Sequence, residues 1–190
     1  MRSSLRFSIP LLGAAALLAG LLVTGGCSST RPNQDPTGMP FPAVVGNSLE
    51  EEPVALPADL AGRPAILLVG YKQRAQFDLD RWVMGLMAAD VAVPIFEVPT
   101  IPSLVPSMIS GWIDDGMRSG IPQEDWGAVV TLYGSAAEPV AAFTGTERGN
   151  LGRALLLDAE GQVVWFDDGG FSPRKVLELA ERARSLEQGR

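Results

Sequence analysis

The side chains that most often do chemistry in proteins are scarce in this chain. Its 190 residues include no His and a single Cys, Cys27. Without His there is no Ser-His-Asp triad, no imidazole base and no imidazole metal ligand. With one Cys there is no internal disulfide, no C-x-x-C redox pair and no Cys-based zinc site. We therefore expect no metal and no cofactor in the folded part of the chain.

Acidic residues recur in short runs along the chain. Carboxylates in such runs ligate hard cations such as Ca²⁺ or, when paired across a cleft, hydrolyse glycosidic bonds. None of the runs has EF-hand spacing, and nothing in the sequence pairs two carboxylates in a cleft. We interpret them as solvated turns: Glu50 to Glu52, Asp114-Asp115, Glu124-Asp125 and Asp167-Asp168.

Two cations, Lys72 and Arg74, stand just before a predicted helix. Free backbone N–H groups and the dipole at a helix start favour anions, so these side chains are candidates for an anion site. The alternative is that they are solvated cations on an acidic protein.

The N-terminus has the pattern of an export signal. Arg2 and Arg6 precede an apolar run over residues 9–23, which is too short to span a bilayer comfortably as a helix. Small residues then lead directly to Cys27. The segment resembles the bacterial lipoprotein signal, although Thr24 stands where that signal usually has Leu. The resemblance implies cleavage after residue 26, acylation of Cys27 and anchoring in a membrane; a plain secretory signal and an uncleaved anchor are the alternatives.

The remainder of the chain divides into two parts. Residues 27–42 are rich in Pro, Ser, Thr and Asn, which predicts a flexible tether, and residues 43–190 predict one folded domain. Without residues 1–26 the chain has 13 basic and 22 acidic side chains, a net charge of −9. Such a surface repels phosphate backbones, so we expect no nucleic-acid partner. Ser28 and Ser29 follow Cys27 without the Asp of inner-membrane retention, which by analogy predicts the outer membrane, facing the periplasm.

The order of predicted elements indicates an α/β fold with a mixed sheet flanked by helices. A short hairpin over 44–56 precedes a strand at 65–70, whose continuous apolar run is typical of a strand covered on both faces. An apolar stripe over 79–87 predicts a helix. Further strands are predicted over 91–98, 128–133 and 141–143, with a proline-rich loop after residue 98. A β-hairpin over 153–166 and a final helix capped by Ser172 complete the domain.

A second helical stripe follows the proline-rich loop and includes Met108, Trp112 and Met117. Aromatic residues and Met are enriched in protein interfaces, so this stripe is a candidate docking face. A stripe at helical spacing is also what a core-facing helix requires, and that alternative stays open.

The folded part resembles the thioredoxin-like superfamily, in its peroxiredoxin and redoxin branch. The matching pieces are the segment from residue 41 to the strand at 65–70, the helix after it, and GRALLLDAEGQVVWF with the last helix. Arg153 and Asp158 stand at characteristic places of that last motif. A more distant likeness is to the thioredoxin-like assembly factor of mitochondrial ATP synthase.

The resemblance implies where a catalytic Cys would stand, just after the strand at 65–70. This chain has Tyr71-Lys72-Gln73-Arg74 there and no Cys. No other side chain replaces a thiolate in thiol–disulfide exchange, so we expect the fold without redox catalysis. By analogy Arg153 joins Lys72 and Arg74 in the candidate anion site. We expect a binding or assembly module with an envelope protein partner; a non-thiol enzyme, or an anion- or metal-binding protein, is the alternative.

Overall fold

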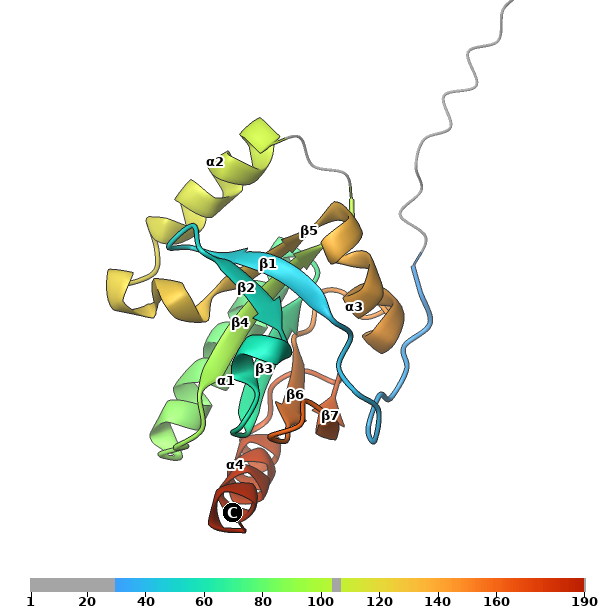
Figure 1. Cartoon of the computed structure of the whole chain (residues 1–190), viewed down its shortest axis with the longest axis vertical. Coiled ribbons are helices and arrows are strands. Elements are labelled where there is room, and N and C mark those ends of the chain that lie inside the picture. Colours follow the sequence, from blue (N-terminus) through green and yellow to red (C-terminus); the bar gives the residue numbers. More distant parts are fainter. Residues whose placement is uncertain (1–29, 104–106, 190) are drawn as a thin grey trace, which may run out of the picture.

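The computed structural model describes residues 30–103 and 107–189, and both the predicted signal and Cys27 lie outside them. Within these residues seven strands form one mixed sheet in the order β2-β1-β5-β4-β3-β6-β7 (Figure 1). The strands are β1 (Val44–Ser48), β2 (Pro53–Leu56), β3 (Ala65–Gly70), β4 (Ile95–Ile101), β5 (Val130–Tyr133), β6 (Arg153–Leu157) and β7 (Val163–Asp167). The helices are α1 (Gln76–Ala88), α2 (Ser107–Arg118), α3 (Glu138–Thr144) and α4 (Pro173–Gln188).

The sheet combines a parallel centre with antiparallel flanks. β3 pairs in parallel with β4, and β4 with β5. β6 runs antiparallel to β3, and β7 antiparallel to β6. On the other side, β1 joins β5 and forms the hairpin with β2. The α/β class, the mixed sheet and both predicted hairpins are confirmed.

β3 shows why its sequence is a continuous apolar run. All six of its residues are buried, and successive side chains point to opposite faces of the sheet. Ile66 and Leu68 belong to the core cluster that contains residues of α1 and α4. Leu67 and Val69 belong to the cluster that contains Val140 of α3. The helices therefore cover both faces of the strand that ends at the candidate site.

Three local expectations are wrong. The strand predicted at 141–143 is part of α3, because Pro139 lies in the first turn of a helix that ends at Gly145, where φ is +72°. β4 begins after Pro94 and continues through Pro99, so the predicted loop starts later. The apolar stripe predicted over 79–87 is buried at Leu79, Trp82 and Leu86, but its last residue, Met87, is 70% exposed.

The segment before β1 is attached to the domain from residue 31 onward. We call residues 31–41 the strap. Gln34 N–H donates to the Thr144 carbonyl, Phe41 N–H donates to the Gly161 carbonyl, and the Phe41 ring is buried. A tether was predicted over residues 27–42, whereas its second half is hydrogen-bonded to α3 and to the β6–β7 turn. The backbone of an extended segment needs partners, and here the domain supplies them.

Helix α2 lies apart from the other helices, on the opposite side of the molecule from the point where the strap begins (Figure 1). Polar contacts hold it in place. The Tyr133 hydroxyl donates to Asp114 at 2.8 Å, and Arg118 Nε donates to the Leu49 carbonyl at 2.8 Å. Hydrogen bonds to β5 and to the end of β1 thus help to set its position.

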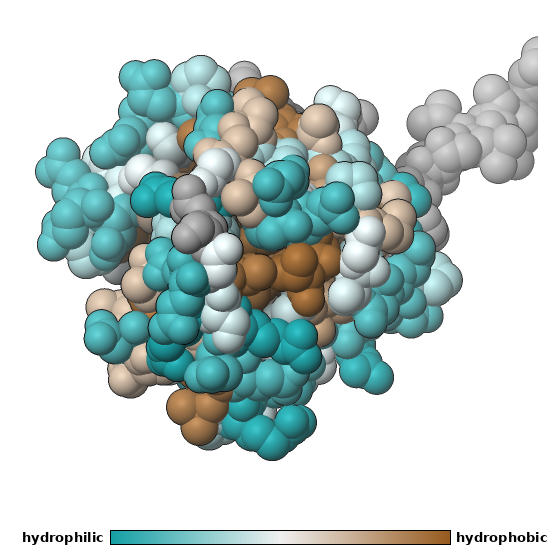
Figure 2. Space-filling view, turned by 60° about the horizontal axis from the view of Figure 1, so that its bottom comes forward, coloured by the Kyte–Doolittle hydropathy of each residue, from teal (hydrophilic) through white to brown (hydrophobic). Residues whose placement is uncertain are grey.

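Hydrophilic residues cover most of the surface that Figure 2 presents, with hydrophobic residues gathered in a central hollow. Large exposed apolar side chains occur on α1, at Phe77 and Met84, and on α4, at Leu177. Within residues 30–103 and 107–189, no helix has the length and apolar character needed to cross a bilayer.

Candidate functional site

The candidate site begins where β3 ends. After Gly70 the chain passes through Tyr71 and Lys72 into a short 3₁₀ turn, Gln73–Ala75, which leads directly into α1. The sequence placed Lys72 and Arg74 at a helix start, and the structure puts them there, both exposed. Tyr71, which the sequence did not single out, points inward instead.

Tyr71 ties the end of β3 to α3. Its hydroxyl donates to the Val140 carbonyl at 2.9 Å and is 2.7 Å from Thr144 Oγ1. Burial raises the pKa of Tyr71 to about 12, because the phenolate would be poorly solvated there. The side chain is therefore a neutral hydrogen-bonding strut at physiological pH.

Arg153, at the start of β6, is fully buried. Its guanidinium lies 4.6 Å from the centre of the Tyr71 ring, a cation–π distance. Nη1 donates to the carbonyls of Leu151 at 3.0 Å and Arg148 at 3.3 Å, and Nη2 reaches Asn33 Oδ1 at 3.4 Å. Nε is buried and has no hydrogen-bond partner among the described residues.

The electrostatic situation of Arg153 is unusual. Burial lowers its pKa, an effect that the nearby Tyr71 and Asp168 oppose. No ion pair to its guanidinium occurs in the part of the chain that the structure describes. Arginine nevertheless keeps its proton in proteins, so the site holds a buried positive charge solvated by carbonyls, one carboxamide and an aromatic face. Such a charge is costly to bury and suits an anion that displaces the carboxamide.

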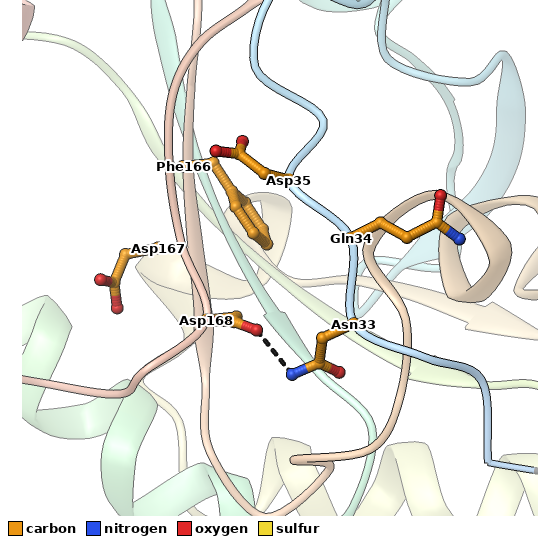
Figure 3. Close-up of a pocket in the computed structure, with 6 residues that line it drawn as sticks. All are labelled: Asn33, Gln34, Asp35, Phe166, Asp167 and Asp168. Carbon is orange, nitrogen blue, oxygen red and sulfur yellow. Dashed lines mark hydrogen bonds between the residues drawn. The ribbon is translucent and has the colours of Figure 1, made fainter.

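The strap closes this site. Asn33 accepts from the Glu147 N–H at 3.0 Å through the same Oδ1 that faces Arg153, and its Nδ2 donates to Asp168 at 2.5 Å. Figure 3 shows Asn33 reaching Asp168 from the strap, with the Phe166 ring between Asp35 and that contact. One strap residue thus bridges Arg153, Asp168 and the loop after α3.

A shallow pocket of about 220 Å³ lies between the strap and the end of β7. Asn33, Gln34, Asp35, Phe166, Asp167 and Asp168 line it (Figure 3). Two of its carboxylates have basic partners: Lys175 is 2.6 Å from Asp167, and Arg148 is 3.9 Å from Asp168. Within the described ranges no three Asp, Glu, Cys or His side chains gather as metal ligands do.

The loop over residues 145–152 brings part of the predicted cation set together. A Cβ on Gly149 would lie 3.2 Å from Lys72 Cε, so the Lys72 stem packs against the same loop whose carbonyls hold Arg153. Arg74 is exposed two residues further along, in the 3₁₀ turn. The structure therefore places Lys72 beside the Arg153 loop and leaves Arg74 at the surface.

Comparison with known proteins identifies the architecture that holds this site. No protein-family model and no curated protein sequence matches the chain. Its structure is similar to a putative protein disulfide isomerase from Bacteroides thetaiotaomicron, with 13% identity, a TM-score of 0.57, and coverage of 83% of this chain and 94% of that one. The fold is thioredoxin-like.

Two lipoproteins share this thioredoxin-like fold. One is a SCO1/SenC family lipoprotein from Bacillus anthracis, with 13% identity, a TM-score of 0.54, and coverage of 82% of this chain and 99% of that one. The other is the exposed lipoprotein thioredoxin of Streptococcus pneumoniae, with 12% identity, a TM-score of 0.50, and coverage of 74% and 99%. At these identities the likeness concerns the fold.

Asp78 is a positioning residue that sequence reasoning missed. It lies in the first turn of α1, where the helix dipole favours a carboxylate. That role alone explains an Asp at this position, so the sequence gives no sign of its contacts to other segments. Its side chain is 7% exposed and accepts from the Gly152 N–H at 2.9 Å and the Phe171 N–H at 3.0 Å. Asp78 therefore fixes the residue before Arg153 against α1.

The candidate docking face on α2 is largely exposed. Trp112 is 77% exposed and Ile109 48% exposed, whereas Met117 is half-buried. The side chain of Met108 lies outside the described residues. Large apolar side chains such as Trp are usually buried, so the exposed Trp112 on this helix marks a candidate interaction site.

Proposed function

We propose that this protein is a lipid-anchored binding module of the cell envelope that uses a thioredoxin-like fold without thiol chemistry. The observation that carries the proposal is the junction of β3 and α1. By the family resemblance a catalytic Cys would stand there, and this chain instead has Tyr71, a partly buried side chain that is hydrogen-bonded to α3 and stacked on Arg153.

Cys27 is the chain's only thiol, and acylation would consume it. Thiol–disulfide exchange requires a thiolate, so the mature protein would have no group able to start it. The lipoproteins that share the fold support an anchored domain of this type. The anchor, the outer-membrane location facing the periplasm and the envelope partner are parts of the proposal.

The partner surface in this proposal is the exposed side of α2. Burial of the Trp112 and Ile109 side chains in an interface would remove apolar surface from water. This would stabilise the complex by roughly 25 cal/mol for each Å² of apolar surface buried. Exposed Trp residues are also among the side chains that most often dominate binding energy. We therefore assign the assembly role to this helix and not to the strap-covered site.

Two measurements test the proposal. The purified chain should neither reduce insulin nor destroy peroxide at enzymatic rates, and turnover of either substrate would refute it.

A photoreactive amino acid at Trp112 should give one defined crosslinked species in intact cells. The matched control is the same replacement at Leu177, an apolar residue of α4 that is 66% exposed; equal crosslinking from both positions would contradict docking through α2.

A second candidate function is small-anion binding. It is favoured by the buried Arg153 Nε–H, which donates a hydrogen bond to none of the described residues. The anion would take the place of Asn33 and contact Arg153, with Lys72 nearby. Calorimetric titration with phosphate, sulfate and acetate tests it. Asn33→Ala should increase the measured affinity and Arg153→Met should abolish binding, while Arg63→Ala, an exposed cation elsewhere, should change nothing. Heats that are the same in all variants would reject the site.

A further inference from the structure

The first contacts of the strap fix the point where the domain is attached to the preceding chain. The Arg31 N–H donates to Thr146 Oγ1 at 2.9 Å, and the Arg31 carbonyl accepts from the Thr146 N–H at 2.9 Å. The Arg31 guanidinium pairs with Glu138 of α3. Asn33 adds two hydrogen bonds to Glu147. Arg31 is therefore held on the surface formed by α3 and the loop after it.

Very little chain separates this point from Cys27. Only residues 28–30 lie between Cys27 and Arg31. Even fully extended, four residue steps span at most about 14 Å. A domain of about 150 residues has a radius of gyration of about 15 Å, which corresponds to a radius of roughly 19 Å for a solid sphere. The connection is thus shorter than the radius of the body that it holds.

We propose that in the acylated protein the surface around Arg31 lies against the lipid headgroups. This strap face consists of Arg31, Glu138, Thr146, Glu147 and Arg148. The inference rests on the proposed acylation of Cys27 and goes beyond it, because an anchor alone does not fix an orientation. The connection of about 14 Å cannot reach from the bilayer to the opposite side of the domain.

The chemistry of the strap face suits a phospholipid headgroup layer. Arg31 and Arg148 contribute positive charge, and Glu138 and Glu147 contribute negative charge, all in side chains that are at least partly exposed. Headgroups present phosphate and ammonium groups together, so a surface with both signs of charge can contact them while staying hydrated. None of the five residues of the strap face is apolar, so this face would rest on the headgroups without entering the hydrocarbon.

This orientation directs α2 away from the membrane. In Figure 1 the strap begins on one side of the molecule and α2 lies on the other. Trp112 would then face the aqueous compartment, where a partner can reach it. The buried Arg153, which lies beneath Asn33 of the strap, would face the lipid side.

Acylation of Cys27 allows site-specific labelling, because an introduced Cys is then the only free thiol. Glu147→Cys and Asp115→Cys each replace an exposed carboxylate that accepts a hydrogen bond, on the strap face and on α2 respectively. Each purified lipoprotein is labelled with a nitroxide and reconstituted into vesicles of phosphatidylethanolamine and phosphatidylglycerol with nickel-chelating headgroup lipids. We expect nickel to enhance relaxation at least fivefold more at position 147 than at position 115.

A longer connection is the matched control. Twelve Gly and Ser residues inserted between Ser29 and Thr30 should reduce the enhancement at position 147 to the value at position 115. Mass spectrometry of the same samples reports acylation, and a chain without acyl groups on Cys27 would refute both the anchor and the orientation. Acylated protein with equal enhancement at both positions would overturn the orientation alone. Unchanged enhancement in the lengthened chain would overturn the role of the short connection.

Discussion

Replacing Asp78 by Asn should loosen the candidate site at a single point. The carboxylate accepts from two backbone N–H groups, Gly152 and Phe171, at a position that is 7% exposed. Asn keeps one carbonyl oxygen and turns an NH₂ group toward the other N–H, which then lacks an acceptor. Hydrogen bonds to charged groups contribute about 1.5–3 kcal/mol, and an unsatisfied buried donor costs about 1–3 kcal/mol. We therefore expect the free energy of unfolding to fall by about 2–4 kcal/mol.

Urea denaturation followed by tryptophan fluorescence measures this change. Trp82 lies in the core, with its ring centre 6.1 Å from that of Trp165 in an edge-to-face arrangement, so its emission should report unfolding. The control is Asp80→Asn, two residues on, where an exposed carboxylate accepts from Gln76 and Asn should cost less than about 0.5 kcal/mol. Amide exchange at Gly152 should also accelerate in the Asp78 variant. If the two variants unfold at the same urea concentration, Asp78 does not hold the Arg153 loop.

Three further predictions concern the strap, the strut and the docking helix. Gly145→Ala should lower the free energy of unfolding more than Gly62→Ala, because both glycines have positive φ but only a Cβ on Gly145 would overlap the Pro32 carbonyl oxygen, whereas Gly62 has open space. Equal losses of unfolding free energy in urea denaturation would show that the strap is not packed against Gly145. Burial raises the pKa of Tyr71 from 10 in the unfolded chain to about 12 in the folded chain, so its contribution to stability is complete below pH 10 and is lost as the pH rises through 12. Tyr71→Phe should remove about 3 kcal/mol of that alkaline loss, measured as the difference between the two stability–pH curves. Trp112→Ser should change the unfolding free energy by less than about 0.5 kcal/mol, because the ring is 77% exposed, and a large loss would place Trp112 in the core instead.

Periodicity in the sequence is enough to predict most of the architecture. The run at 65–70 is a strand covered on both faces, and the Ser172-Pro173 pair begins α4 as predicted, with Ser172 accepting from the Lys175 N–H. These signals are local, so they can be recognised without the tertiary structure. The prediction for residues 141–143 is wrong because a three-residue apolar run has no period, and Pro139 and Gly145 at the ends of α3 decide its conformation.

The absence of His and the presence of a single Cys are properties of the sequence, and by themselves they exclude a His-based triad and an internal disulfide. The contacts of the site cannot be read in that way. Asn33 and Arg153 are 120 residues apart, Asp78 and Gly152 are 74 apart, and nothing in the local pattern marks them as a group. A buried guanidinium needs partners from several segments because no single segment can surround it. The sequence determined that His is absent and that Cys27 is the single Cys, whereas only the folded chain decided which side chains enclose Arg153 and where on the domain the strap is attached.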